Sequence, residues 1–129
     1  MQIKLIILDF DGTLASTADA HTKAYIMALK ESGIRFSEEE YRNRFFGVRC
    51  SEFLRTIGIT NKEDMERIRL RKIELYPTFF DSVRLNEPLW HFVQDFRAQG
   101  GKAWIVSTGQ RDNIENAMRY LGIEGMVDG

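Results

Sequence analysis

The sequence predicts an α/β protein whose parallel sheet is interrupted by an all-helical insertion. Two short apolar runs, residues 5–8 and 103–106, have the length and composition of buried strands. The segments that follow each run show the periodicity of helices. Strand, crossover helix and strand in this order are typical of a parallel sheet with right-handed connections.

The first apolar run, residues 5–8, ends abruptly in acidic residues. Asp9 and Asp11 are one residue apart, so their carboxylates project to the same side of an extended chain while Phe10 points back into the protein. Gly12 permits a sharp turn, and Thr13 adds a hydroxyl and a backbone N–H. We expect this strand to be covered on both faces, and ligands bind just past the carboxyl ends of such strands.

The two acidic residues predict a metal-assisted reaction on an anionic substrate. Neighbouring carboxylates repel each other and repel anions, and Mg²⁺ removes this repulsion by binding one or two carboxylates together with phosphate oxygens and water. One aspartate can then attack phosphorus and the other can transfer a proton. The alternative is that Asp9 and Asp11 are turn residues that end a strand. An EF-hand loop fits less well, because its glycine belongs at the sixth position and Gly12 stands at the fourth.

Helical periodicity and capping residues fill the segment from residue 16 to about residue 84. We expect four helices there. Their caps and stops, in chain order, are Ser16 or Thr17 to Gly33, the Ser37/Glu40 capping box to Gly47, Ser51 to Gly58, and the Thr60/Glu63 capping box to Pro77.

The α/β pattern resumes after this segment. Asn86 caps a helix, the strand at 103–106 follows, a further helix ends at Gly122, and residues 126–127 open a third strand. We therefore divide the chain into a partial α/β core, residues 1–15 and 85–129, and a helical cap, residues 16–84.

Composition excludes several classes of partner. Eighteen basic and nineteen acidic residues give a net charge of −1 without a long block of one sign, so we expect neither a nucleic-acid partner nor a membrane surface. Cys50 is the single cysteine, which excludes an internal disulfide and favours the cytoplasm. No apolar run has the length of a signal-peptide core or a transmembrane span.

The order Asp9-Phe10-Asp11-Gly12-Thr13 after an apolar strand resembles the first motif of the haloacid dehalogenase (HAD) superfamily, which consists mostly of Mg²⁺-dependent phosphohydrolases. The resemblance implies a HAD-like, Rossmann-type sheet. It makes Asp9 the nucleophile and Asp11 the general acid/base, places both at the Mg²⁺ site, and puts Thr13 beside the phosphate. The dehalogenating members lack the second aspartate, so Asp11 favours phosphoryl transfer.

Ser107-Thr108-Gly109 ends the second apolar run and resembles the second motif of the same superfamily. Parallel strands place both polar ends at one edge, where the Ser107 hydroxyl and the N–H groups of Thr108 and Gly109 can bind a phosphoryl group. A serine in this position is otherwise a turn or cap residue.

The helical insertion resembles the cap of the β-phosphoglucomutase and phosphoglycolate phosphatase branch, which closes over the site and selects the substrate. This resemblance implies substrate contacts for His21, Arg49 and Lys72. The alternative places His21 half-exposed on its helix and Arg49 and Lys72 on solvated helix faces.

The chain departs from the superfamily at its end, because neither the third-motif Lys or Arg nor the acidic fourth motif can be assigned. We expect the front portion of a longer phosphatase with an incomplete sheet, whose free edge needs a partner or self-association. The leading hypothesis is a Mg²⁺-dependent phosphatase that acts on a small phosphorylated metabolite through an acyl phosphate on Asp9. The alternatives are a sugar-phosphate mutase and a non-catalytic binding module.

Overall fold

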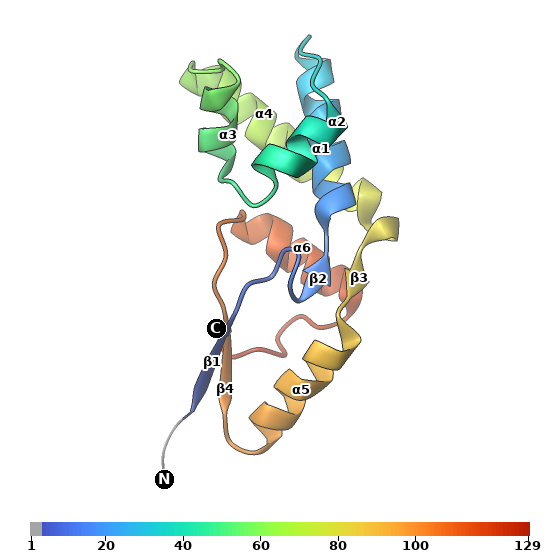
Figure 1. Cartoon of the computed structure of the whole chain (residues 1–129), viewed down its shortest axis with the longest axis vertical. Helices are drawn as coiled ribbons and strands as arrows, with labels where there is room; N and C mark the ends of the chain where they lie inside the picture. The colour runs from blue at the N-terminus through green and yellow to red at the C-terminus, as the bar shows by residue number, and fades with distance from the viewer. Residues whose placement is uncertain (1–3) are drawn as a thin grey trace.

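The computed structural model describes residues 4–129 and contains the two predicted parallel strands (Figure 1). Strand β1 (Leu5–Leu8) pairs with β4 (Lys102–Ile105), so that Leu5 lies opposite Lys102 and Leu8 lies opposite Ile105. Helix α5 (Glu87–Ala98) precedes β4, and Asn86 caps it as expected, because its side chain accepts a hydrogen bond from the Leu89 N–H. The fold is therefore mixed α/β with a small parallel sheet, as predicted.

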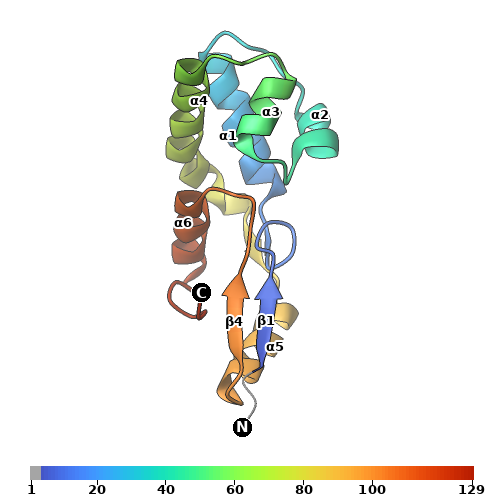
Figure 2. The ribbon, with the colours of Figure 1, turned by 90° about the vertical axis from the view of Figure 1, so that its left-hand side faces the viewer.

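Helix α5 covers only one face of this sheet. Leu8, Val93 and Ala103 form a buried cluster between the helix and the strands. Side chains on the opposite face are exposed, including Ile7 at 64% and Trp104 at 49%. Figure 2 shows the two strands in front of α5, with nothing laid across the face toward the viewer. The expectation that the first strand is covered on both faces is therefore wrong for the described residues, because α6 (Arg111–Leu121) packs against the helical insertion instead.

The predicted third strand is also absent, since residues 126–127, which the structure describes, form no strand. The last two residues nevertheless lie alongside β4. Asp128 donates its N–H to the carbonyl of Ala103, and Ile105 donates its N–H to the carbonyl of Gly129. The carboxylate of Asp128 is paired with Arg97 of α5 at 3.0 Å.

The helical insertion contains the four predicted helices, but their ends differ from the prediction at several points. The third helix begins at Cys50, with Arg49 in the cap position, and not at Ser51. Asn61, rather than Thr60, caps the fourth helix, because its side-chain oxygen accepts hydrogen bonds from the N–H groups of residues 63 and 64. Pro77 does not stop the chain from coiling, because it starts a 3₁₀ helix. The elements are α1 (Ala18–Glu31), α2 (Glu38–Glu40), the π-helical turn η1 (Tyr41–Phe45), α3 (Cys50–Thr56), α4 (Lys62–Leu75) and the 3₁₀ helix η2 (Tyr76–Ser82).

An aromatic cluster fills the centre of the insertion. Phe53 is 1% exposed, and its ring lies between 4.8 and 5.5 Å from four other aromatic rings. Such pairs stabilise a core beyond the area that they bury. The other members of the cluster are Tyr25, Phe36, Tyr41 and Phe45.

A short antiparallel ribbon joins the insertion to the rest of the chain. Strand β2 (Ala15–Ser16) pairs with β3 (Arg84–Leu85), and both predicted domain boundaries fall within these strands. The buried core is continuous across this junction, because Phe10 and Leu14 pack in the same cluster as the aromatic residues of the insertion. No helix among residues 4–129 combines the length and the apolar character that a membrane crossing requires.

Candidate active site

The acidic loop after β1 is held in shape by its own backbone. The carbonyl of Phe10 accepts hydrogen bonds from the N–H groups of Thr13, Leu14 and Ala15, so the chain turns tightly around this buried residue. Gly12 has φ of 79°, and a Cβ atom there would lie 3.3 Å from the Phe46 ring of the insertion. Glycine is therefore required both by the backbone conformation and by the close approach of the insertion.

The ends of the two parallel strands lie close together, as the sequence predicts. Val106 extends the ladder by donating its N–H to Leu8, and this directs Ser107 toward the acidic loop. A Cβ atom on Gly109 would lie 3.1 Å from Oδ2 of Asp11 and 3.3 Å from Oγ of Ser107. The absence of a side chain at Gly109 therefore leaves room for both functional groups at this position.

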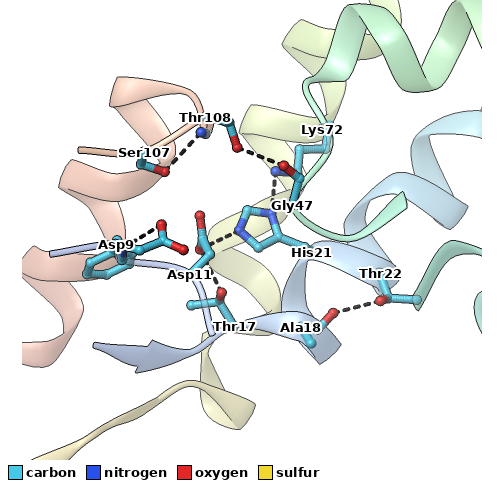
Figure 3. A network of polar contacts seen from close by, with 12 residues as sticks. Asp9, Asp11, Thr17, Ala18, His21, Thr22, Gly47, Lys72, Ser107 and Thr108 are labelled. Carbon is cyan, nitrogen blue, oxygen red and sulfur yellow. Dashed lines mark hydrogen bonds and ion pairs between the residues drawn. The ribbon is translucent and has the colours of Figure 1, made fainter. Parts of the chain in front are cut away.

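The carboxylate of Asp11 is held by two residues at the start of α1 (Figure 3). Thr17 donates its hydroxyl to Oδ1 at 2.6 Å, and Nε2 of His21 lies 2.9 Å from the same oxygen. The sequence predicts Thr17 as a helix cap, and it does occupy the cap position, but its side chain makes no capping hydrogen bond. Its hydroxyl binds the functional carboxylate instead.

Lys72 from α4 completes this network. Its Nζ lies 2.6 Å from Nδ1 of His21. An ammonium group can only donate, so Nδ1 accepts and the neutral imidazole carries its proton on Nε2, where it is donated to Asp11. The three groups form a continuous chain of hydrogen bonds from the insertion to the acidic loop.

The pKa values of these three groups follow from their burial and their proximity. Burial lowers the pKa of Lys72 to about 7, although the charge of Asp11 opposes this shift. Burial and the neighbouring Lys72 lower the pKa of His21, which keeps it neutral near pH 7. Burial alone would raise the pKa of Asp11, but its hydrogen bonds from His21 and Thr17 and the charge of Lys72 lower it overall.

Aromatic rings enclose the lysine and histidine. Lys72 is 3% exposed, and its Nζ lies 4.7 Å from the ring centre of Tyr25 and 4.6 Å from that of Tyr76. Tyr76 also stacks on His21 at 4.3 Å. The faces of these rings stabilise the ammonium group. The alternative interpretation of His21 and Lys72 as partly or fully solvated helix residues is therefore wrong.

A cavity of about 410 Å³ opens between the insertion and the strand ends, within the range of roughly 300–1,000 Å³ that is typical of small-molecule sites. Both aspartates line it, and so does Arg49, which is exposed. Thr13 is exposed and does not line it. The predicted residues that the cavity brings together are Asp9, Asp11, His21, Arg49, Lys72, Ser107, Thr108 and Gly109.

Two direct contacts hold the insertion over this cavity. The hydroxyl of Thr108 donates to the carbonyl of Gly47 at 2.8 Å, and Arg69 donates to the side chain of Gln110 at 3.3 Å. The insertion therefore contacts the segment after β4 directly.

Sequence reasoning missed several residues of this site. Tyr25, Tyr41, Cys50 and Asn113 line the cavity, but their helical spacing gives no signal that separates a cavity wall from a core. Burial raises the pKa of the Cys50 thiol, which disfavours the thiolate that a nucleophile requires.

The donor set of the cavity fits a hard cation. Among the described residues, no three side chains of His, Cys, Asp or Glu are grouped as a metal site, and the carboxylates that line the cavity are those of Asp9 and Asp11. Mg²⁺ commonly takes one or two carboxylates and completes its shell with water and substrate oxygens. In Figure 3 both carboxylates lie on the side of the loop that faces Ser107 and His21.

The fold resembles that of several solved structures. The chain resembles a hydrolase from Pseudomonas syringae with a TM-score of 0.82 and 18% identity, over 97% of this chain and 58% of that one. It resembles CbbY from Rhodobacter sphaeroides in complex with phosphate, with a TM-score of 0.78 and 21% identity, over 92% of this chain and 56% of that one. This chain therefore spans less than two thirds of the length of either structure.

The family follows from the sequence profile of haloacid dehalogenase-like hydrolases, which matches residues 6–128. The chain belongs to this family. None of the curated protein sequences matches it.

Proposed function

We propose that this chain carries the site of a Mg²⁺-dependent phosphatase that hydrolyses a small phosphorylated metabolite through an aspartyl phosphate. One observation carries the proposal. Asp9 and Asp11 share a cavity with Ser107, and Asp11 is held by hydrogen bonds from a neutral histidine and a threonine instead of by an internal cation. Such a carboxylate is fixed in position and still able to exchange a proton.

The proposed reaction has two steps. A carboxylate oxygen of Asp9 attacks phosphorus, the ester P–O bond breaks, and the departing oxygen takes from Asp11 a proton that Lys72 supplies through His21. Asp11 then removes a proton from water, the water oxygen attacks phosphorus, and Asp9 is released together with inorganic phosphate. A bound Mg²⁺ supplies charge neutralisation between the carboxylates and the phosphoryl oxygens.

The remaining residues of the cavity have positioning roles in this proposal. Ser107 and the backbone N–H groups of residues 108 and 109, at the N-terminus of α6, bind the phosphoryl oxygens. His21 and Lys72 hold Asp11 in place and form a route by which a proton can reach it. Thr13 does not line the cavity, so the proposal assigns it no contact with the phosphate.

Phosphate release from an aryl phosphate tests this function. Asp9→Asn removes the nucleophile and is expected to lower the rate by at least about 10³-fold, and chelation of divalent cations is expected to do the same. Asp95→Asn on the exposed surface of α5 is the matched control and should retain the rate. Equal rates for both variants would exclude the proposed role of Asp9.

A sugar-phosphate mutase is the second candidate. The presence of Arg49 in the cavity, beside the buried His21 and Lys72, favours it, since a guanidinium group can bind a second phosphate. Interconversion of phosphosugar isomers without release of phosphate would select this function over hydrolysis. CbbY has also been solved with xylulose-1,5-bisphosphate, a sugar with two phosphates.

Two further expectations concern the surroundings of the protein. Self-association over the sheet can cover the exposed side chains of Ile7 and Trp104, and sedimentation over a range of concentrations tests this.

The unpaired Cys50 thiol fits the reducing cytoplasm that we propose as the compartment. If the protein binds phosphate without any turnover, it is a binding module instead.

A further inference from the structure

Asn113 is a buried polar residue that lines the cavity. It lies in the first turn of α6, is 1% exposed, and lines the cavity together with Gln110, which lies three residues earlier on the same side of the helix. Ala117, four residues later, is fully buried. This side of α6 therefore runs from the cavity into the core.

The carboxamide of Asn113 has no hydrogen-bond partner among residues 4–129, at either Oδ1 or Nδ2. Among the described residues, the Tyr76 hydroxyl is the other buried side-chain group without a partner, whereas four buried polar side chains have one: Thr17 and His21 bind Asp11, Thr22 binds the Ala18 carbonyl, and Lys72 binds His21. An unpaired buried amide is unfavourable, and an apolar residue of similar size would pack there without this cost. Packing therefore does not explain an asparagine at this position.

We propose that Asn113 is a specificity-determining residue that binds a hydroxyl group on the leaving group of the phosphorylated substrate. This inference rests on the proposed phosphatase function. It names a feature of the substrate beyond the phosphate, namely a hydroxylated carbon chain, and it assigns the recognition of that feature to α6.

The chemistry of the carboxamide selects a hydroxyl over other groups. Nδ2 donates and Oδ1 accepts, and a hydroxyl group can accept from the first and donate to the second. A carboxylate or a phosphate oxygen can only accept, so it would leave Oδ1 unpaired. A carboxylate would also be repelled by Asp9 and Asp11 in the same cavity.

Two ligands that differ only in their hydroxyl groups test the proposal. Glycerol 3-phosphate and propyl phosphate have the same carbon number and the same phosphate group. Their dissociation constants are measured by calorimetry with Mg²⁺ present, in the Asp9→Asn background so that neither ligand is consumed. We expect glycerol 3-phosphate to bind about tenfold more tightly, the ratio that corresponds to about 1.4 kcal/mol.

Substitutions in α6 test whether Asn113 is responsible for this preference. Asn113→Leu and the smaller Asn113→Ser should each reduce the tenfold preference to less than about twofold. Asn116→Leu is the matched control, because Asn116 lies on the same helix outside the cavity and its Oδ1 accepts from Arg119. This variant should retain the preference. Without ligand, Asn113→Leu should melt at the same or a higher temperature, because it removes an unpaired amide.

Each other outcome overturns the inference. Equal binding of the two ligands by the parent protein would exclude a hydroxyl contact while leaving the phosphatase proposal intact. If Asn113→Leu weakens the binding of both ligands to a similar extent, the carboxamide contacts the phosphate and not the hydroxyl. A lower melting temperature with an unchanged preference would make Asn113 a structural residue. If neither ligand binds, this inference and the proposed function fail together.

Discussion

The helical insertion and the α/β region differ in how completely they bury their apolar side chains. The insertion encloses its aromatic residues from all sides, so that Phe53 and Leu54 are almost completely buried. The sheet, by contrast, buries Leu8 and Ala103 against α5 and leaves alternate residues of the same strands exposed. Stability is therefore expected to come mainly from the insertion, because apolar area removed from water provides the dominant favourable term.

This difference bears on how the site is held. Both aspartates follow the strand with one exposed face, yet Asp11 is fixed by Thr17, His21 and Lys72, all of which are at least nine-tenths buried in the insertion. The better-packed region thus supplies the rigid contacts to a carboxylate on the less covered region. Loosening the insertion should disturb the site even when no cavity residue is changed.

The largest expected effect comes from truncating the aromatic cluster of the insertion. Phe53→Ala should lower the free energy of unfolding by about 3–5 kcal/mol, since it leaves a cavity among well-packed rings. Phe92→Ala on α5 is the matched control, because Phe92 is 60% exposed, and it should cost less than about 0.5 kcal/mol. Urea unfolding of both variants measures the difference. Equal losses would contradict the proposed division of stability.

The next effect concerns the pH dependence that Lys72 introduces. The folded-state pKa of Lys72, about 7, lies below its ordinary value of 10.5, so the unfolded chain binds more protons between these values. Stability should therefore rise with pH across this window and fall as the pH drops toward 7. From pH 7 to 8.5 the gain is at most about 2 kcal/mol, from about 1.4 kcal/mol per pH unit for one proton.

Lys72→Met should abolish this dependence, because methionine fills a similar volume and binds no proton. Unfolding by urea at pH 7 and at pH 8.5 measures it. Lys62→Met, at the exposed start of α4, serves as the control and should keep the slope. A slope that persists in Lys72→Met would show that another group titrates in this range.

A smaller effect is expected from the hydroxyl that binds Asp11. Thr17→Val removes a hydrogen bond to a charged group and should cost roughly 1.5 kcal/mol near pH 7. It should also raise the pKa of Asp11. Because that pKa is lowered in the folded protein, Asp11 stabilises the fold above its ordinary pKa of 3.8 and loses this contribution as the pH falls.

An NMR titration of the Asp11 carboxyl carbon follows this change in pKa directly. Thr60→Val is the control, since Thr60 is exposed and the neighbouring Asn61 provides the cap of α4. The titration curve of Asp11 should be the same in this control as in the parent protein. An unchanged curve in Thr17→Val would argue against the hydrogen bond from the threonine.

The smallest effect should appear on the exposed face of the sheet. Ile7→Thr should change the free energy of unfolding by less than about 0.5 kcal/mol, whereas Leu8→Thr, on the buried face one residue later, should cost about 2 kcal/mol or more. Sedimentation should show weaker self-association for Ile7→Thr. If both substitutions cost the same, the two faces of β1 are equally covered in solution.

Much of the fold could be predicted because local spacing carries it. The capping residues Ser37 and Asn86, the stop at Gly122 and the acidic end of the first strand all stand where the sequence places them. The predictions were wrong where the outcome depends on tertiary packing or on a choice between neighbouring residues, which local spacing does not determine. Coverage of both strand faces depended on where α6 packs, and the cap of α4 depended on which of two adjacent polar residues reaches the free N–H groups.

The sequence by itself determined that two carboxylates follow the first apolar strand and that a serine follows the second. It also determined that helices lie between these two strands. These features depend on residues within one or two turns of each other, where spacing fixes direction. Only the tertiary structure decided that Lys72 meets His21, 51 residues away, and that Asn113 is buried without a partner. Contacts of that kind arise from the packing of whole helices, and burial then sets the protonation and hydrogen bonding of each group.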